Sequence, residues 1–388
     1  MRVAICQPLI PAYRLPLFER LGALPTVELT VYAGGSSGSL EGFQAGTSFR
    51  VVSAPVYRWV AGLGAQFAQV TALWRGGFDL MIAPWDIHYL TLAPAVALAR
   101  SSGVPIVLWG HGYSQRPHRL TDAARNICGR LADGVLLYSQ SVAAALISEY
   151  RFSVDRVFVA PNALDQSPIQ AARQSWLGRP PALAEFQRLH GIDPAQTIVF
   201  ISRLEASNRT ELLLQATEAL SREHPRLKTV IVGNGSQRER LGQLARSLGI
   251  HDRVIFTGAI YDEPTLAPWM LSGSLFCYPT NVGLSILHAF GYGLPSVTSD
   301  NIRAHNPEIE ALIPDVNGLR YREGDLHDLV RQCARILDDP ALQSRLSEAA
   351  SKTALEQYSM DQMVEGFKQV FHWAGGHRDR RAGVGKAL

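Results

Sequence analysis

Two successive series of short apolar runs, each alternating with longer amphipathic segments, constrain the fold of this chain most. The runs of the first series are rich in Val, Ile and Leu and are bounded by Gly, Pro or Asp: RVAICQ, VELTVYA, FDLMIAP, PIVLWG, DGVLLYS and VFVAPN. Near-continuous apolar strands of this kind suit a parallel sheet that is covered on both faces. Segments such as RLPLFERLGAL and LAPAVALARSSG lie between them and suit crossover helices.

The second series begins near residue 196. Its predicted strands are TIVFISRL, LKTVIVGNG, RVIFTGAI, GSLFCYP and PSVTSD. Its predicted helices are ELLLQATEALSREHP, which ends at Pro225, and SQRERLGQLARSLGI, which stops at Gly249. Two such runs predict an α/β protein with two doubly wound, Rossmann-like domains.

The length of 388 residues also favours more than one domain. We expect a first domain over 1–165, a polar, Pro-containing linker over 166–194 and a second domain over 195–360. Residues 361–388 are expected to form a C-terminal helix and a frayed, Gly- and Arg-rich basic tail.

Composition narrows the class of protein and its compartment. The chain is 47% hydrophobic and 18% charged with a net charge of +3, which fits a globular protein. The basic residues are spread along the chain, so nucleic-acid binding is not expected. The four cysteines, Cys6, Cys128, Cys277 and Cys333, fit no zinc or disulfide pattern and suit buried positions in a reducing compartment. No secretion signal or membrane-spanning run is evident, so we expect a cytoplasmic protein.

Glycine-containing turns suggest a phosphate site in the second domain. Gly233 and Asn234 stand between a strand and a helix, where the backbone can approach a phosphate or simply make a tight turn. Gly283 opens a predicted helix over 284–292, and its first amides, at Leu284 and Ser285, would face the carboxyl edge of the sheet. A pyrophosphate suits that position, although a buried structural helix would look similar.

Two arginines add charge beside these turns. Arg203 follows a predicted strand, and Arg209 stands at the start of the next helix. The guanidinium group matches the geometry of phosphate, but either residue could instead be a solvated surface charge.

Together these motifs resemble glycosyltransferase family 4, and the resemblance covers nearly the whole chain. It rests on SRL at 202–204, VGNG at 232–235, FTG at 256–258 and the segment GL-SILHAFGYGLPSV, and in the first half on PAYRLPLFERL, WGHG at 109–112 and APNALD at 160–165. The resemblance implies a GT-B fold, in which two Rossmann-like domains face each other across a cleft and C-terminal helices pack back on the first domain.

The resemblance also implies roles for individual residues. Arg203 would bind the donor diphosphate, and His111 would lie beside the donor sugar. Backbone groups of Gly283, Leu284 and Ser285 would contact phosphate and sugar. On the nucleotide side, the donor would be contacted by Gly233, Asn234, Thr257 and Gly258. On the acceptor side, the site would be lined by Tyr13 and Arg14.

The chain departs from the family at three positions. The family's lysine is replaced by Asn208, beside Arg209, which could supply the charge although one residue of offset on a helix is about 100° of rotation. The two glutamates that the family spaces eight residues apart correspond to Thr280 and His288. Some bacterial polysaccharide-building relatives share this VGLS-type helix and an H-x-P-E segment, which makes Glu308 and His288 candidates for the donor contacts.

The resulting hypothesis is a hexosyltransferase that uses a nucleotide diphosphate sugar, needs no metal or other cofactor, and retains the anomeric configuration. Its acceptor would be a glycan, a lipid-linked saccharide or a small molecule. Two alternatives stay open: a GT-B nucleotide-sugar epimerase and a degenerate GT-B scaffold subunit. A nicotinamide-dependent oxidoreductase is disfavoured, since the first turn, Gln7-Pro8-Leu9, has no glycine.

Peripheral contact with the inner face of a membrane is a further hypothesis. The segment 56–77 combines Trp59, Trp74, Arg58 and Arg75 with apolar residues, as an interfacial helix would. An ordinary core helix that packs on the sheet is the alternative.

Overall fold

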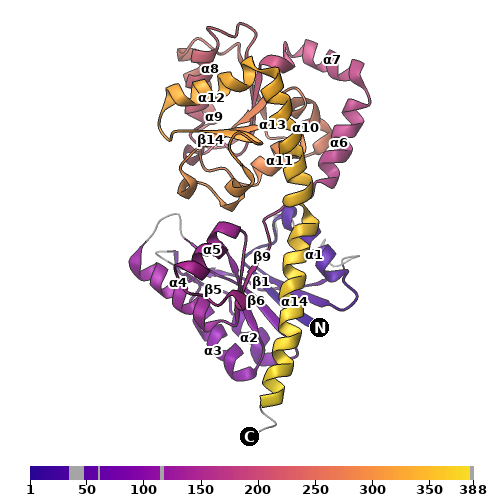
Figure 1. Cartoon of the computed structure of the whole chain (residues 1–388), viewed down its shortest axis with the longest axis vertical. Helices are drawn as coiled ribbons and strands as arrows, with labels where there is room; N and C mark the ends of the chain where they lie inside the picture. Colours follow the sequence, from indigo (N-terminus) through magenta and orange to yellow (C-terminus); the bar gives the residue numbers. More distant parts are fainter. Residues whose placement is uncertain (35–47, 60–61, 114–117, 385–388) are drawn as a thin grey trace. The chain divides into compact units, whose positions relative to one another are not determined.

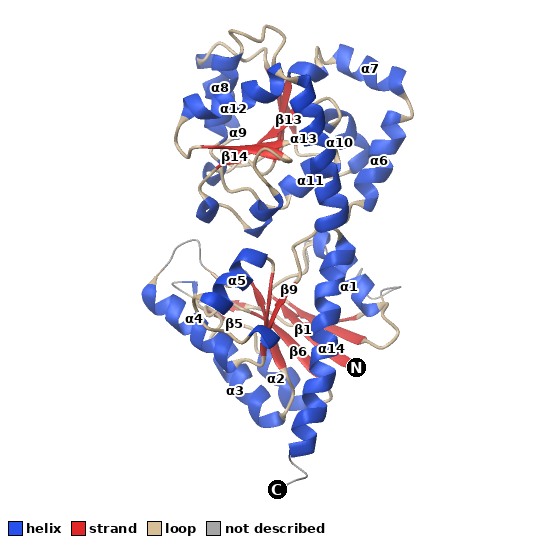
Figure 2. Ribbon diagram, in the orientation of Figure 1, coloured by secondary structure: helices blue, strands red, loops and turns tan. Residues whose placement is uncertain are grey.

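The computed structural model describes residues 1–34, 48–59, 62–113 and 118–384. The chain divides into two compact units, of which unit 1 comprises 1–162 and 360–388 and unit 2 comprises 163–359. Each unit is an α/β layer structure with a parallel sheet between helices (Figures 1 and 2). This confirms the predicted fold class of two Rossmann-like domains.

In the described part of unit 1, the sheet has seven strands in the order β3-β2-β1-β6-β7-β8-β9. Their bounds are β1 Arg2–Gln7, β2 Glu28–Ala33, β3 Arg50–Ser53, β6 Leu80–Pro84, β7 Ile106–Gly110, β8 Gly134–Leu137 and β9 Val157–Val159. Every residue of β6, β7 and β8 is buried, as the apolar runs predict for strands covered on both faces.

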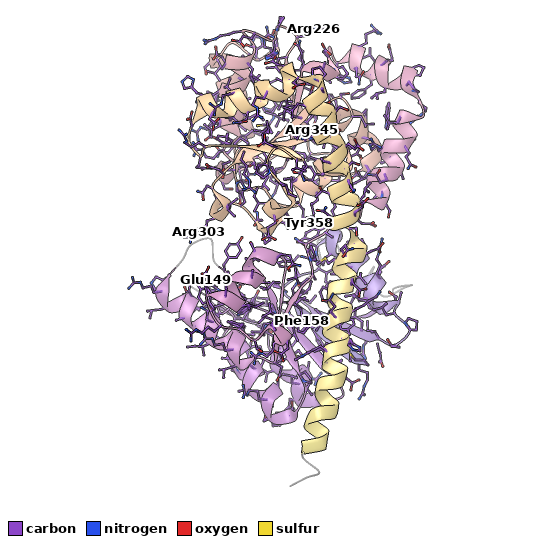
Figure 3. The ribbon with its side chains drawn as sticks, viewed as in Figure 1. Glu149, Phe158, Arg226, Arg303, Arg345 and Tyr358 are labelled. Carbon is purple, nitrogen blue, oxygen red and sulfur yellow. The ribbon has the colours of Figure 1, made fainter. Side chains whose placement is uncertain are left out.

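The α-helices in the described residues of unit 1 are α1 Leu15–Gly22, α2 Ala68–Arg75, α3 Leu92–Ser102, α4 Arg119–Leu131, α5 Gln140–Ser148 and α14 Met360–Val384. The last of them comes from the far end of the sequence and packs against α1 and β9. Phe158 of β9, labelled in Figure 3, packs against Trp373 of α14. Their ring centroids are 5.5 Å apart. The helix continues to Val384, through most of the tail that we expected to be frayed, because Ala and Arg are strong helix formers.

The segment 56–77 is not one helix. A short antiparallel pair, β4 Tyr57–Arg58 and β5 Gly64–Ala65, precedes α2. Residues 60 and 61 lie outside the described residues. Trp59 and Trp74 are 52% and 80% exposed, so neither ring packs in the core. Gly62, with φ +76°, and the strand pair interrupt the helical periodicity that the sequence suggested.

The sheet of unit 2 has six strands in the order β12-β11-β10-β13-β14-β15. The strands are β10 Thr197–Ile201, β11 Lys228–Val232, β12 Val254–Gly258, β13 Leu275–Cys277, β14 Ser296–Ser299 and β15 Gly318–Tyr321. From β10 the chain adds β11 and β12 on one side of that strand, and it then adds β13, β14 and β15 on the other side. Since crossovers are right-handed, this reversal places α10 and α11, which connect β12 to β13 and β13 to β14, on the opposite face from the two helices that connect β10, β11 and β12.

The helices of unit 2 form two layers around this sheet. In one layer, α8 Thr210–Leu220 contacts both α9 Arg238–Ser247 and α12 Leu326–Asp338. On the other face, α10 Glu263–Met270 and α11 Ser285–Gly291 both contact α6 Ser167–Leu177, and α11 also contacts α13 Pro340–Lys352. A single turn of π-helix, Thr353–Gln357, follows α13.

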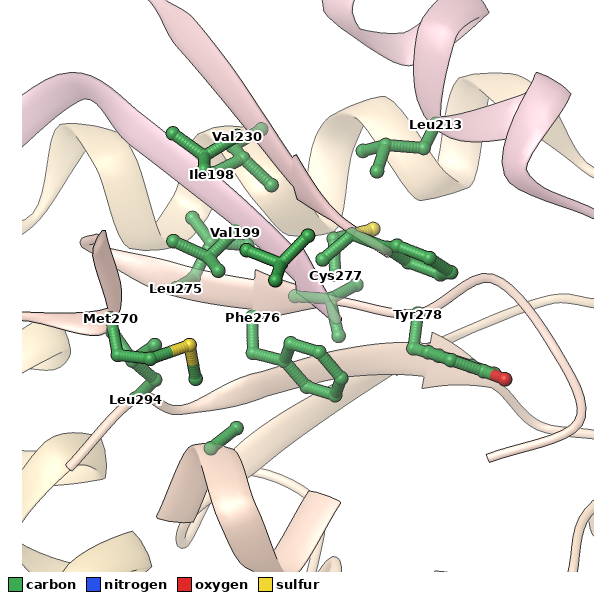
Figure 4. Packing of buried hydrophobic residues seen from close by; sticks show 14 of the residues in the cluster. Ile198, Val199, Leu213, Val230, Met270, Leu275, Phe276, Cys277, Tyr278 and Leu294 are labelled. Atoms are coloured by element: carbon green, nitrogen blue, oxygen red, sulfur yellow. The ribbon is translucent and has the colours of Figure 1, made fainter. Parts of the chain in front are cut away.

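Buried side chains from both layers and the sheet between them form the core of unit 2. Figure 4 shows Val199 of β10, Leu213 of α8 and Phe276 of β13 in this cluster. All three side chains are fully buried. Cys277 and Cys333 are fully buried as well, as expected for small core residues.

Residues 166–194, which the sequence presents as a polar linker, are mostly helical. They form α6 and α7 Pro180–Leu189, and α6 packs on α10 and α11. Gln166 and Gln170 donate to the carbonyls of Leu287 and Gly291 at 3.2 and 2.7 Å. The polar composition suggested a linker, but these two amide side chains donate to backbone carbonyls of the neighbouring helix instead of facing water.

No helix within the described ranges is both long and apolar enough to cross a membrane.

Candidate functional site

The strand order places the candidate site of unit 2 at the carboxyl ends of β10 and β13. These neighbouring strands are followed by crossovers that leave in opposite directions. In open α/β sheets the loops at such a reversal separate and leave a crevice in which ligands bind. The loop 202–209 follows β10, and the loop 278–284 follows β13.

Asn208 ties these two loops together. Its Nδ2 donates to the carbonyl of Arg203 at 2.6 Å, and its Oδ1 accepts from Nδ2 of Asn281 at 2.9 Å. Tyr278 adds a second link, since its hydroxyl donates to Oγ of Ser202 at 3.0 Å. Asn208 is only 4% exposed. The residue at the position of the family's lysine is therefore a buried structural bridge.

Arg209, the next residue, pairs with a carboxylate of α8. Its backbone is left-handed, with φ 51° and ψ 36°, at the N-cap of α8. Its Nε donates to Oε1 of Glu211 at 2.7 Å. The side chain is 43% exposed, so it keeps an accessible charge beside the site that is already shared with a carboxylate.

Arg203 is exposed in the loop after β10 and forms no ion pair with any residue in the described part of the chain. Its charge still acts on its neighbours. The hydrogen bond from Ser236 and the charge of Arg203 lower the pKa of Glu205. Burial raises the pKa of Tyr278, and Arg203 opposes that rise. Arg203 thus adds positive potential to the site.

The glycine turn after β11 is required by backbone packing. A Cβ on Gly233, whose φ is +146°, would lie 1.9 Å from the carbonyl oxygen of Ser202. The amide of Leu204 donates to the carbonyl of Asn234 at 2.9 Å, so the turn lies directly on the β10 loop. Asn234 itself is exposed. The glycine therefore has a structural cause that does not depend on a ligand.

Thr257 and Gly258 end β12 beside this turn. The amide of Gly233 donates to the carbonyl of Gly258 at 2.8 Å. Gly258 has φ +79°, which releases the chain from the strand. Both residues are partly accessible.

The start of α11 is held by a buried histidine. Nδ1 of His305 accepts from the amide of Val282 at 3.0 Å, and its Nε2 lies 3.0 Å from Oγ and 3.2 Å from the carbonyl of Ser299. Nδ2 of Asn306 donates to the carbonyl of Val282 at 3.1 Å. Burial lowers the pKa of His305 to about 4, and Arg320 adds to that effect. A neutral imidazole thus fixes the loop before Gly283.

The first turn of α11 presents Gly283, Leu284 and Ser285 as partly accessible residues. The first backbone hydrogen bond of this turn runs from Ile286 to the carbonyl of Gly283 at 3.1 Å, so the preceding amides lack helical partners. Thr280, in the same loop, is 6% exposed, and its Oγ1 has no hydrogen-bond partner among the described residues. A buried hydroxyl without a partner is unusual and is expected to meet a ligand or water.

His288 lies one turn further along α11 and contacts a carboxylate. Its Nε2 is 3.0 and 3.1 Å from the two carboxylate oxygens of Glu263, the first residue of α10. The hydroxyl of Tyr292 donates to Oε2 of the same glutamate at 2.7 Å.

Glu308 is buried, at 4% exposure, on the short 3-10 helix Pro307–Ala311. It acts electrostatically on Tyr358, whose pKa is raised by burial first and then by Glu310 and Glu308. Glu308 is therefore a buried carboxyl group in the first turn of a short helix.

In unit 1 the switch point lies between β1 and β6, and the turn after β1 carries Tyr13 and Arg14. Tyr13 is 39% exposed, whereas Arg14 is 6% exposed. Nη1 of Arg14 donates to Oδ1 of Asn162 at 2.9 Å. Its guanidinium carbon lies 4.9 Å from the ring centre of Trp109 and 5.3 Å from that of Tyr138. Arg14 is thus enclosed by neutral groups of its own unit.

His111 follows β7, and its ring lies 5.3 Å from that of Tyr138. The residue keeps an exposed surface, yet enough protein surrounds the ring to desolvate an imidazolium. That desolvation and the charge of Arg14 lower the pKa of His111. The structure therefore brings His111, Arg14 and Tyr13 to one region of unit 1.

No group of three or more His, Cys, Asp and Glu side chains arranged to hold a metal ion occurs in the residues that the structure describes.

Comparison with known families agrees with this architecture. A model described as Glycosyltransferase Family 4 matches residues 19–167, and one described as Glycosyl transferases group 1 matches residues 195–339. The chain is a glycosyltransferase of the GT-B fold.

Individual relatives show how far the likeness extends. This glycosyltransferase is 26% identical to the alpha-D-kanosaminyltransferase of Streptomyces kanamyceticus over 296 residues, which are 70% of this chain and 72% of that protein. It is 25% identical to a glycogen synthase of Mycobacterium tuberculosis over 329 residues, which are 81% of this chain and 75% of that enzyme. The crystal structure of Anabaena Alr3699/HepE in complex with UDP has a TM-score of 0.75 at 16% identity, covering 96% of this chain and 100% of that one.

Sequence reasoning missed several residues that shape the site. Asn208 signalled only a departure from the family, and neither Tyr278 nor the pairing of Glu263 with His288 had a local signal, since each partner lies on a different element. The H-x-P-E segment drew attention to Glu308, yet its histidine and asparagine are the residues that hold the β13 loop.

Proposed function

We propose that this glycosyltransferase moves a hexosyl unit from a nucleotide diphosphate sugar to a hydroxyl group of a saccharide, lipid-linked or small-molecule acceptor. The proposal includes retention of the anomeric configuration, no required metal, and a place in polysaccharide or glycoconjugate biosynthesis.

The observation that carries the donor assignment is the pair of joined loops at the β10–β13 reversal. These loops carry the accessible charge of Arg203, the helix-start amides at Gly283–Ser285 and the hydroxyl of Thr280, which has no hydrogen-bond partner among the described residues. Arginine and free amides suit a diphosphate, and a buried hydroxyl suits an oxygen-rich ligand.

The chemistry that such a site supports is stabilisation of a leaving group. Negative charge accumulates on the diphosphate as the bond to the sugar breaks. Arg203 and the amides at the start of α11 would stabilise that charge. Arg209 would contribute less, because Glu211 neutralises part of its charge. No acid–base pair of carboxylates is proposed, so a double-displacement scheme is not part of this mechanism.

Other residues have assigned contacts in this proposal. We assign Gly233, Asn234, Thr257 and Gly258 to the nucleotide side through their backbones. Glu308 and His288 are assigned to hydroxyl groups of the donor. In unit 1, His111 is assigned to the donor sugar, and Tyr13 and Arg14 to the acceptor side. The neutral state favoured for His111 would let it exchange hydrogen bonds with a sugar hydroxyl.

Relatives support the general class of substrates. One relative is by name a kanosaminyltransferase, another is a glycogen synthase, and the structural neighbour was solved in complex with UDP. We therefore propose UDP-sugars as the first donors to test. We also propose that the protein works in the cytoplasm. Contact with the inner face of the membrane is a separate proposal, which liposome flotation would test.

The test is a thermal-shift panel of nucleoside diphosphates and their sugars, followed by turnover with the best donor. A ligand that binds only the folded state raises the melting temperature. Arg203→Gln should lose most of the shift, while Arg222→Gln, at an exposed position just beyond the C-terminal end of α8, should not. A product with inverted configuration would refute the retaining mechanism.

Two alternatives have distinct outcomes in the same experiment. Turnover of the nucleotide sugar without an acceptor would indicate an epimerase. A chain that binds no nucleotide in the panel would indicate a scaffold subunit instead of an enzyme.

A further inference from the structure

Helix α4 presents apolar side chains to the solvent and polar ones to the protein. Arg125 is 8% exposed and pairs with a carboxylate of the same helix. Gly129 lies on the same inner side, where a Cβ would be 2.4 Å from the ring of Trp85. Leu120 and Ile127, by contrast, are 75% and 57% exposed. An ordinary surface helix has the opposite orientation, with its apolar stripe against the core.

The exposed apolar residues of α4 form one continuous stripe. Its members are three or four residues apart, so they share one side of the helix. The stripe consists of Leu120, Ala123, Ala124, Ile127 and Leu131. It extends from the second residue of the helix to the last, about 16 Å. All of its members are exposed, so no described segment of the chain covers this stripe.

Two neighbouring helices continue this apolar surface. Helices α2, α3 and α4 lie side by side in one layer of unit 1, and α3 contacts both of the others (Figure 2). Phe67, at the N-cap of α2, and Trp74 are seven residues apart and therefore lie on one side of that helix, both of them exposed. On α3 the exposed residues include Ala93, Pro94 and Ala97. We call the outward surface formed by these residues and the α4 stripe the α2–α4 face.

The charges around the α2–α4 face are almost all positive. In these three helices, every residue of which the structure describes, the one carboxylate is Asp122, which pairs with Arg125. The exposed charged residues of the helices are Arg75, Arg100, Arg119 and Arg130. Arg100 and Arg130 donate to backbone carbonyls at 3.0 and 2.7 Å. None of the four arginines forms an ion pair with a described residue, so the face keeps its positive charge.

Helix α14 shows that this surface is not typical of the unit. It packs on α1 and β9, and its exposed residues include Asp361, Glu365 and Lys368. Its exposed side is therefore polar and carries both signs of charge, as expected of a helix that faces water. The α2–α4 face combines apolar rows with one sign of charge, which is the pattern of helices that lie in the plane of a membrane surface.

We propose that the α2–α4 face docks unit 1 on an anionic lipid surface. Its large apolar side chains would enter the boundary between headgroups and acyl chains, and its arginines would pair with lipid phosphates. This inference names the surface for the membrane contact included in the proposed function and rests on that part of it. A second copy of this chain is a poorer occupant, because two such faces would bring arginines together without carboxylates to pair with them.

The experiment is flotation of the full chain with two kinds of vesicle, phosphatidylcholine alone and phosphatidylcholine mixed with an equal amount of phosphatidylglycerol. The wild type should float with the mixed vesicles and much less with the neutral ones. Leu120→Ser/Ile127→Ser removes the two most exposed large side chains of the stripe and should weaken binding at least tenfold, by roughly the cost of exposing part of each side chain again. Arg119→Gln/Arg130→Gln should weaken binding to the mixed vesicles by roughly thirtyfold.

Matched controls carry the same kinds of change in unit 2. Leu177→Ser/Leu189→Ser removes exposed leucines of α6 and α7, and Arg222→Gln/Arg331→Gln removes exposed arginines. Both controls should float as the wild type does. Every altered position is exposed, so all chains should keep the melting temperature of the wild type. The thermal shift produced by a nucleotide should also be the same in all of them, since the donor loops belong to unit 2.

Each other outcome overturns a defined statement. A wild type that floats with neither vesicle overturns the docking and the membrane contact together, and leaves the glycosyl transfer untouched. If the leucine and isoleucine variant floats as the wild type does, the contact lies on another surface. If the arginine variant does so, the face does not recognise lipid charge. A wild-type dimer that does not float and that the serine substitutions dissociate would make the face an interface between two copies.

Trp74 provides a second readout of the same contact. Lipids that carry bromine on their acyl chains quench the fluorescence of a tryptophan that enters the bilayer. Trp74→Phe should lose most of the quenching that the wild type shows, whereas Trp176→Phe, in unit 2, should keep it. Equal quenching in the two variants would place Trp74 outside the docked surface and overturn the proposal for α2.

Discussion

Loss of the neutral charge state of His305 should loosen the loop that begins the candidate donor site. The ring accepts from the Val282 amide through Nδ1 and lies fully buried between that loop and Ser299. Protonation would turn Nδ1 into a donor that faces another donor. Acidification is therefore the perturbation, and His305→Asn is the variant that keeps an acceptor near Val282 without titrating.

The magnitude follows from the pKa of His305, about 4 in the folded chain against an ordinary 6.5. Because folding lowers this pKa, the unfolded chain binds more protons between pH 6.5 and pH 4, so stability falls as the pH falls through that window. Each pKa unit corresponds to 1.36 kcal/mol, which makes the full effect roughly 3 kcal/mol. Between pH 7 and pH 5 the loss attributable to His305 is about 2 kcal/mol.

The assay is urea unfolding followed by circular dichroism at pH 7 and pH 5 for the wild type, His305→Asn and the exposed His251→Gln. The wild type and His251→Gln should lose about 2 kcal/mol more than His305→Asn on acidification. Equal losses in all three chains would refute the assignment of a buried neutral acceptor to His305.

Three further predictions test other parts of the two units. Asn208→Leu, which removes the bonds to Arg203 and Asn281, should cost about 1–3 kcal/mol and weaken nucleotide binding, measured by urea unfolding and calorimetry; unchanged binding would show that the two loops do not need this bridge. Gly233→Ala should lower the melting temperature far more than Gly249→Ala, since both have positive φ but only the first places a Cβ against backbone, 1.9 Å from Ser202; similar shifts would contradict the packing argument. Arg14→Met should raise the pKa of His111 in NMR titrations while Arg14→Lys leaves it low, because Arg14 contributes to lowering it through its charge; an equal rise in both variants would mean that the charge is not involved.

Much of the fold could be predicted because the signals are local. The buried strands β6, β7 and β8 were visible as continuous apolar runs, and α9 ended before Gly249 as expected. Where the predicted fold was wrong, the cause is a contact with a distant part of the chain. Residues 166–194 looked like a linker because the side chains of Gln166 and Gln170 bond to the backbone of α11, a partner more than a hundred residues away.

The candidate site likewise has features that the sequence predicted and features that only the folded chain shows. The sequence by itself determined the two sheets and placed Arg203, Gly233 and Gly283 at strand ends, because apolar periodicity and glycine turns depend on neighbours in the chain. Only the tertiary structure decided that Asn208 bridges two loops, that His305 clamps Val282 and that Glu263 orients His288. These choices depend on hydrogen bonds between elements that are distant in sequence, and a polar side chain carries no local mark of the partner that it will meet.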